Sequence, residues 1–221
     1  MSDAADPSSY QPFLDELTAH ASTDDKKAAL VDSRAEYQRL TGEVFEDDKQ
    51  FEMRMASFLD WYLFDRPNPA TDKTPAQEFY AAAVREGPPE RAAAFRAFTE
   101  TVHALFEVRK LGKGLVRLRE LFSGKDYDVS ERRQLAGLEK GDLIEARLIP
   151  FGGTYVFSAA FCCHPKGAFK AILKEMKRRK KKEPDRPSRE LVYECAKRSL
   201  KADRYRQIAV EKIYDFENRK L

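Results

Sequence analysis

The chain has 221 residues, of which 42 % are hydrophobic, so it can bury a core without disulfides or a metal. Charged residues make up 35 % at a net charge of only +3, and both signs are therefore dense on the surface. Three cysteines without regular spacing exclude a disulfide framework, and no apolar run is long enough for a membrane span. The acidic N-terminus does not resemble a signal peptide. We expect a soluble, cytoplasmic protein with reduced thiols.

Charge is distributed unevenly along the chain. Residues 1–50 carry a net charge of −7, residues 51–160 are balanced, and residues 161–221 carry +10. This asymmetry predicts either that the two ends attract each other or that the C-terminal part has an anionic partner.

The first part of the chain has the apolar spacing of helices, after a lead over residues 1–9 that we expect to be disordered. Ser22, Thr23 and Asp24 are suited to cap a helix that runs to Gly42. A longer helix follows and should stop before Pro67. Its wide apolar face recurs at helical steps: Val44, Phe45, Phe51, Met55, Phe58, Leu59, Tyr62 and Leu63.

Prolines mark the start of two further helices. Thr74 precedes Pro75 as an N-cap, and the helix that they begin should end near Gly87. Pro88-Pro89 starts the next helix, which we expect over about 88–104. The apolar side chains on one face of that helix are Ala94, Phe95, Phe98, Val102 and Leu105.

From Leu105 the sequence changes to short runs rich in β-branched, aliphatic and aromatic residues. Every gap between these runs contains a glycine or another turn residue. The runs cover residues 105–110, 115–121, 127–132, 142–150 and 154–161. Five short strands at this spacing predict an antiparallel meander, either left open or curled into a small barrel.

Helical spacing returns after His164-Pro165. One helix is expected from about 166 to 182, and Ser188 can cap a last helix that extends toward Phe216 with a break near Ala202-Asp203. The predicted class is α+β. It comprises a helical region (1–104), a small antiparallel five-stranded β-region (105–164) and a basic helical region (165–221), packed as one or two domains.

The segment Phe58-Leu59-Asp60-Trp61-Tyr62-Leu63-Phe64-Asp65-Arg66-Pro67 resembles a motif in uncharacterised bacterial proteins. In those proteins an aromatic helix ending in F-D-R precedes a short β-region. The stretch over residues 141–148 resembles that β-region, because a glycine–acid turn leads into a strand. The resemblance covers about residues 45–165. It implies helices followed by a sheet and, since no activity is known for the group, it implies no catalytic residue.

Barrels of the PilZ type, which bind cyclic dinucleotides, offer a second comparison. They use an R-x-x-x-R arm followed by a D/N-x-S-x-x-G strand. This chain has Arg132-Arg133 and a Gly141-Asp142 turn, but neither the arginine spacing nor the serine motif.

The sequence contains no nucleophile elbow, phosphate-binding loop, dinucleotide fingerprint or H-E-x-x-H motif. We therefore predict no catalytic residue, no metal site and no cofactor. Two clusters remain as alternatives, and the first is Cys162-Cys163-His164. A zinc site needs convergent ligands, whereas neighbours on a strand point apart, which favours one cysteine in the core.

The second cluster surrounds the end of the aromatic helix. Asp60 and Asp65 are five residues apart and should diverge around the helix, which argues against paired acid–base carboxylates. Arg66 at the helix C-terminus favours capping and salt bridges. Trp61 lies one step from the apolar stripe, and we interpret it as a packing residue.

The basic run over residues 177–182 is the strongest compositional signal. On a helix, Lys166, Lys170, Lys174 and Lys177 form a cationic stripe that could follow phosphates. The residues that we predict to bind nucleic acid, with the tyrosine as a stacking group, are Lys174, Lys177, Arg178, Arg179, Lys180, Lys181, Lys182, Arg198, Arg204 and Tyr205. The alternatives are a solvated helix face and docking on the acidic residues 1–50.

Two functional hypotheses follow. The first is a non-enzymatic interaction or adaptor protein with an unknown protein partner. The second is a nucleic-acid-binding accessory protein that uses residues 166–206 for phosphate contacts to DNA or RNA. A membrane partner is not expected, because the apolar side of helix 166–182 is narrow. An enzyme that uses either cluster above is the third class.

Overall fold

The computed structural model describes residues 10–131 and 137–217; the predicted disordered lead and Arg132-Arg133 lie outside this part of the chain. The N-terminal helices are α1 (Gln11–Ala21), α2 (Lys27–Thr41), α3 (Phe51–Phe64), α4 (Pro75–Glu86) and α5 (Pro89–Thr99), with a 3-10 turn η2 (Asp24–Lys26). The C-terminal helices are α6 (Phe169–Lys182), α7 (Arg189–Arg204) and α8 (Val210–Ile213), after a 3-10 turn η3 (Lys166–Ala168).

Between the two groups of helices lie the strands β1 (Val102–Gly112), β2 (Leu115–Glu120), β3 (Asp126–Ser130), β4 (Leu143–Phe151) and β5 (Thr154–Cys163). The α+β class is therefore confirmed, and five strands occur where five apolar runs predicted them. The strands pair in the closed order β1-β2-β3-β5-β4. The closing seam is narrow, because β3 and β5 register only at Val129 and Tyr155.

The prediction of an antiparallel meander is wrong in two respects. β3 and β5 are parallel, and β4 pairs with β1 instead of β3. The reason is the length of β1, whose residues 102–107 pair with β4 while residues 106–112 pair with β2. One long strand thus joins both halves of the sheet, and it pairs residues that are 36 to 46 positions apart in the sequence.

Strand alternation divides the apolar residues of the sheet between the inside of the barrel and the helices outside it. Inside the barrel lie Ala104, Phe106, Val108, Val116, Leu118, Val129, Ile144, Ala146, Leu148 and Phe157. The opposite side of β1, β4 and β5 packs against helices, as Leu105, Leu143 and Ile149 show. These strands are therefore buried on both faces, which makes their helix-facing residues the ones that hold the protein together.

Local signals predicted most helix starts but not all helix ends. Thr74 accepts from the Gln77 amide, and Gln77 in turn caps Thr74, so the expected cap of α4 is confirmed as a capping box. Gly42 ends α2 at a φ of 94°, where an L-residue would be strained. The helix expected over 88–104 stops at Thr99, because Val102 and Leu105 pair with β4 instead. Val44 and Phe45 precede α3, which begins only at Phe51.

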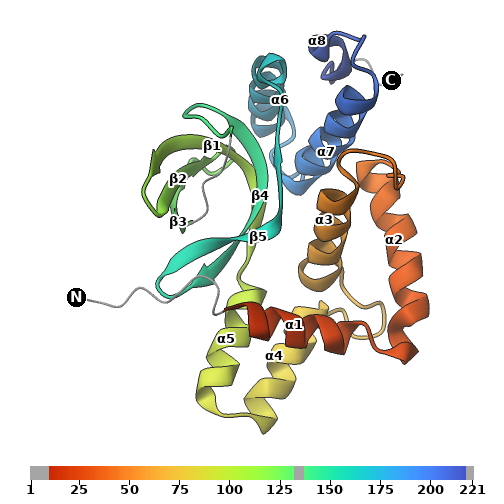
Figure 1. Cartoon of the computed structure of the whole chain (residues 1–221), viewed down its shortest axis with the longest axis vertical. Helices are drawn as coiled ribbons and strands as arrows, with labels where there is room; N and C mark the ends of the chain where they lie inside the picture. Colours follow the sequence, from red (N-terminus) through yellow and green to blue (C-terminus); the bar gives the residue numbers. More distant parts are fainter. Residues whose placement is uncertain (1–9, 132–136, 218–221) are drawn as a thin grey trace.

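Figure 1 shows α3 beside β4 and β5, with α2 outside it, while β2 and β3 lie on the side of the barrel away from these helices. α4 and α5 form an antiparallel pair, and α7 packs against α2 and β1. None of the helices in the described part of the chain has the length and apolar character needed to cross a membrane.

Candidate functional site

A cluster of charged side chains lies between α3 and the barrel. Alternate residues of β4 point into the barrel, so Glu145 and Arg147 point toward the helices. His103 of β1 is the register partner of Arg147. Asp60 and Asp65 come from α3 and its C-cap. Two strands and one helix, distant in sequence, therefore bring five titratable groups together.

Arg147 is the centre of this charge cluster and only 2 % of its side chain is exposed. Its Nη2 pairs with the Asp65 carboxylate, and its Nη1 donates to Thr101 Oγ1 over 2.8 Å. Its Nε lies 3.8 Å from Asp60 Oδ2, within ion-pair range. The guanidinium also lies 5.1 Å from the centre of the Phe64 ring. A single arginine therefore reaches both carboxylates, which helix geometry alone had led us to expect on diverging sides.

His103 lies between two acids of the cluster, Glu145 and Asp65. Its Nε2 lies 3.2 Å from Glu145 Oε1, and its Nδ1 lies 3.8 Å from Asp65 Oδ2. Burial acts to raise the pKa of Glu145, but the hydrogen bond to His103 and nearby cations leave that pKa below its ordinary value. Burial raises the pKa of Asp60 in spite of Arg147. Glu145 therefore favours the charged form, whereas burial disfavours the charged form of Asp60.

The charge cluster lacks room for a substrate. The cavity that it lines with Ser57 and Cys162 has a volume of about 10 Å³, which matches one water molecule. In the described residues no three His, Cys, Asp or Glu side chains are placed to hold a metal ion. The geometry therefore supports a structural anchor between α3 and the barrel, in line with the salt-bridging interpretation of Asp65.

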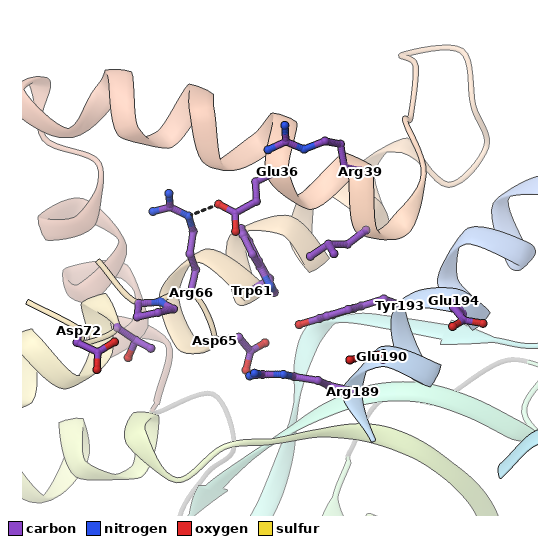
Figure 2. A pocket seen from close by; sticks show the side chains of 13 residues that line it. Glu36, Arg39, Trp61, Asp65, Arg66, Asp72, Arg189, Glu190, Tyr193 and Glu194 are labelled. Atoms are coloured by element: carbon purple, nitrogen blue, oxygen red, sulfur yellow. Dashed lines mark hydrogen bonds and ion pairs between the residues drawn. The ribbon is translucent and has the colours of Figure 1, made fainter. Parts of the chain in front are cut away.

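A larger cleft of about 680 Å³ adjoins the cluster at Asp65. Figure 2 shows it between α2 and α7, with Trp61 and Tyr193 facing each other across its floor. The side chains that line it are Glu36, Arg39, Leu40, Trp61, Asp65, Arg66, Pro67, Asp72, Thr74, Arg189, Glu190, Tyr193 and Glu194. Trp61 is 4 % exposed and packs against Tyr37, so the packing interpretation holds, although its edge also borders the cleft.

The Cys162-Cys163-His164 corner is divided between core and surface. Cys162 is buried and Cys163 is exposed, as expected for neighbours on a strand. His164 follows the last residue of β5, is buried, and lies with its Nδ1 3.1 Å from the Tyr214 hydroxyl. Burial raises the pKa of the Cys162 thiol to about 11, which leaves it protonated and unreactive at neutral pH.

The predicted nucleic-acid-binding arginines are mostly held by acidic partners. Arg178 pairs with Glu175 and Glu183, and Arg179 is 3 % exposed between Glu175 and Glu194. Because the guanidinium of Arg179 is buried, phosphate contact by this residue is excluded, and we correct that assignment.

The remaining two arginines stack on aromatic rings. Arg198 lies 4.2 Å from the centre of the Phe216 ring, and Arg204 lies 5.0 Å from that of Phe45. Arg204 also pairs with Asp48, so among the described residues one ion pair between the acidic and basic ends does form. Arg204 belongs to α7, whereas the basic residues of α6 form ion pairs with acids within residues 175–217.

The predicted lysines and the tyrosine remain at the surface. Lys177, Lys181 and Lys182 are exposed and have no ion-pair partner in the described part of the chain. Lys174 pairs with the exposed Glu217, and Lys180 donates to the Phe122 carbonyl over 2.7 Å. Tyr205 is 47 % exposed. The structure thus brings the lysines together on α6 and places Tyr205 apart from them, beyond the end of α7.

Sequence reasoning missed His103, Glu145 and Arg147. The available signal was the strand Leu143–Phe151, an apolar run with two opposite charges spaced by two residues. In a strand buried on both faces, such charges share one side and need partners from another element. The pattern indicates a buried polar contact, but not which helix supplies it.

Comparison with curated proteins and with solved structures finds no match. A family model described as "Family of unknown function (DUF7986)" matches residues 25–195, which is more than half of the chain. The match contains α2 to α6 and the first residues of α7, and with them both walls of the cleft and the whole charge cluster. It confirms the resemblance to an uncharacterised family, while the F-D-R motif itself stays a prediction. The chain therefore belongs to this family of unknown function.

Proposed function

We propose that this protein is a non-enzymatic nucleic-acid-binding accessory protein whose phosphate contacts run along the outer face of α6. The observation that carries the proposal is a row of exposed lysines at helical steps: Lys170, Lys174, Lys177 and Lys181. Steps of three and four residues place side chains on one side of a helix. At 1.5 Å per residue the row is about 16 Å long, the length of about five phosphates along one DNA strand.

The lysines of this row differ from the surrounding arginines because most of them have no ion-pair partner among the described residues. Lys170, Lys177 and Lys181 have no ion-pair partner among the described residues, and the pair that Lys174 makes with Glu217 is exposed. Exposed pairs of this kind contribute little and are easily exchanged for a phosphate. Lysine ammonium groups act as point charges, which suits backbone contacts without base recognition.

The barrel supports the same proposal through its position. Lys180 of α6 donates to Phe122 in the turn between β2 and β3, so the lysine row adjoins that side of the barrel. Five-stranded Greek-key barrels of the OB-fold type bind oligonucleotides on the β2–β3 face. Architecture does not define function, so the proposal depends on the lysines and treats the barrel as additional surface.

The test is a salt titration of binding to single-stranded DNA, duplex DNA and RNA. The variant changes Lys170, Lys174, Lys177 and Lys181 to Gln. Each phosphate contact contributes about −0.7 to −0.9 to the slope of log affinity against log salt concentration, so the variant should lose about 3 from the slope. The loss should be similar for every sequence, because no base contact is removed.

A matched control changes the same number of exposed cations in the N-terminal helical region, Lys27, Lys49, Lys73 and Arg85, to Gln. The control has the same net charge as the variant and should retain the wild-type slope. No binding by the wild type at low salt, or equal loss in both variants, contradicts the proposal. Either result would leave a protein partner, in the adaptor role and a cytoplasmic setting, as the function to test next.

A further inference from the structure

The cleft between α2 and α7 has the size and lining of a small-molecule site. Its volume of about 680 Å³ falls in the range of ligand pockets. Leu40, Pro67 and the edges of Trp61 and Tyr193 form its apolar surface. The α6 lysine row does not contribute to this lining, so the cleft is a separate site and the inference goes beyond the proposed function.

Four of the five acids that line the cleft already have an arginine partner. Glu36 accepts from Arg66 over 2.8 Å, and Asp65 pairs with the buried Arg147. Glu190 accepts from Arg186 over 2.6 Å. Glu194 is shared by guanidinium groups of the C-terminal helices, Arg179, Arg186 and Arg198. The fifth acid, Asp72, makes no ion pair with the described residues, and Figure 2 places it at the end away from Tyr193.

Two arginines of the cleft have no such partner. Arg189 and Arg39 are exposed and make no ion pair or hydrogen bond among the described residues. Figure 2 shows Arg189 extending along the floor below Tyr193, while Arg39 lies on α2 at the opposite rim. Arg189 is also the first residue of α7, so the positive end of a 16-residue helix adds to its field. Near Tyr193, Arg189 therefore offers donors that no acid among the described residues occupies.

We infer that the cleft binds a small organic anion, with its acidic head group on Arg189 and its planar or apolar body against Trp61, Tyr193 and Leu40. Guanidinium groups bind carboxylate and phosphate in a bidentate manner, so either head group fits the same donors. The acids around the site do not repel the ligand strongly, because each of those near Tyr193 is neutralised by an arginine.

Trp61 is the only tryptophan of the chain, so its fluorescence reports on the edge of this cleft without a signal from another tryptophan. The full-length protein is titrated with adenosine monophosphate, with 4-hydroxybenzoate and with neutral adenosine. A saturable change with either anion at or below about 1 mM, and a much weaker response to adenosine, is the expected result. The anion that binds more tightly identifies the head group as phosphate or carboxylate.

Variants connect the signal to Arg189. Arg189→Gln should weaken binding about tenfold, because it removes a charge-assisted contact, whereas Arg39→Gln at the opposite rim should have a smaller effect. Arg85→Gln, an exposed arginine of α4 outside the cleft, is the control and should bind like the wild type. Circular dichroism of each variant checks that the fold is intact.

Three results would overturn the inference. They are no saturable response to either anion, adenosine binding as tightly as the anions, or unchanged affinity in the Arg189→Gln variant. The α6 lysine variant separates this site from the nucleic-acid surface, since it should keep anion binding while losing DNA and RNA.

Discussion

The charge cluster beneath α3 and the lysine row on α6 both contain cations, but in opposite surroundings. Arg147 is 2 % exposed and has an oriented partner in Asp65, a second acid nearby and a hydroxyl. Lys181 is exposed and has none among the described residues. A buried cation is committed to its internal partners, because losing them leaves charges without water. An exposed cation is available to a ligand and contributes little to stability.

α6 contains both situations on one helix. Its inner face holds Arg179 between Glu175 and Glu194, and its outer face holds the lysines. The run of basic residues therefore combines an internal ion-pair network with a free surface. Burial, and not residue type, separates the two roles.

The largest effect should come from Arg147→Met. The substitution leaves Asp60 and Asp65 near the barrel without their cation, which should cost about 3–5 kcal/mol of unfolding free energy. Urea unfolding followed by circular dichroism measures the change. The triple variant Asp60→Asn/Asp65→Asn/Arg147→Met should recover part of the loss. If Arg147→Met were as stable as the wild type, the cluster would not be an anchor.

A smaller effect should separate the two faces of α6. Arg179→Gln leaves the buried Glu175 with fewer donors and should cost about 2 kcal/mol. Lys181→Gln, two residues along the same helix, should leave the urea midpoint unchanged while weakening nucleic-acid binding. Equal stability losses in both variants would remove the distinction between the faces.

The buried His164 should make stability depend on pH. Burial lowers its pKa to about 4, below the ordinary value of 6.5, so the unfolded chain takes up the proton first. Its contribution is complete above about pH 6.5 and is lost as the pH falls toward 4, by about 2 kcal/mol between pH 7 and 5. Unfolding at both pH values should show a smaller pH dependence in His164→Asn than in the wild type. A parallel dependence in the two proteins would mean that other groups cause it.

The smallest effect is expected on the outer face of the barrel. Arg117 makes two hydrogen bonds to Asp128, of 2.7 and 2.8 Å, across β2 and β3, but both side chains are nearly half exposed. Water can replace these contacts, so Arg117→Gln should unfold at the wild-type urea concentration. A clear shift of the midpoint would show that geometry can outweigh exposure in this protein.

Local patterns in the sequence were sufficient to predict the positions of most helices and strands. Thr74 and Gln77 cap α4 through bonds within one turn, and Gly42 supplies the positive φ that ends α2. The five strands matched apolar runs bounded by turn residues. In each case the interaction that determines the element lies within a few residues, so it can be predicted from composition and spacing.

Contacts between distant segments determined the strand pairing, the charge cluster and the burial of individual side chains. Val102 and Leu105 fit the apolar face of a helix, yet pairing with β4 made them part of a strand. The same pairing placed His103 beside Arg147 and under α3, which assembled the charge cluster from residues 60 to 147. The basic run was visible in the sequence, but only packing against α7 showed that Arg179 is enclosed and Lys181 free. Burial and pairing depend on which segments meet, and spacing along one segment does not encode its partner.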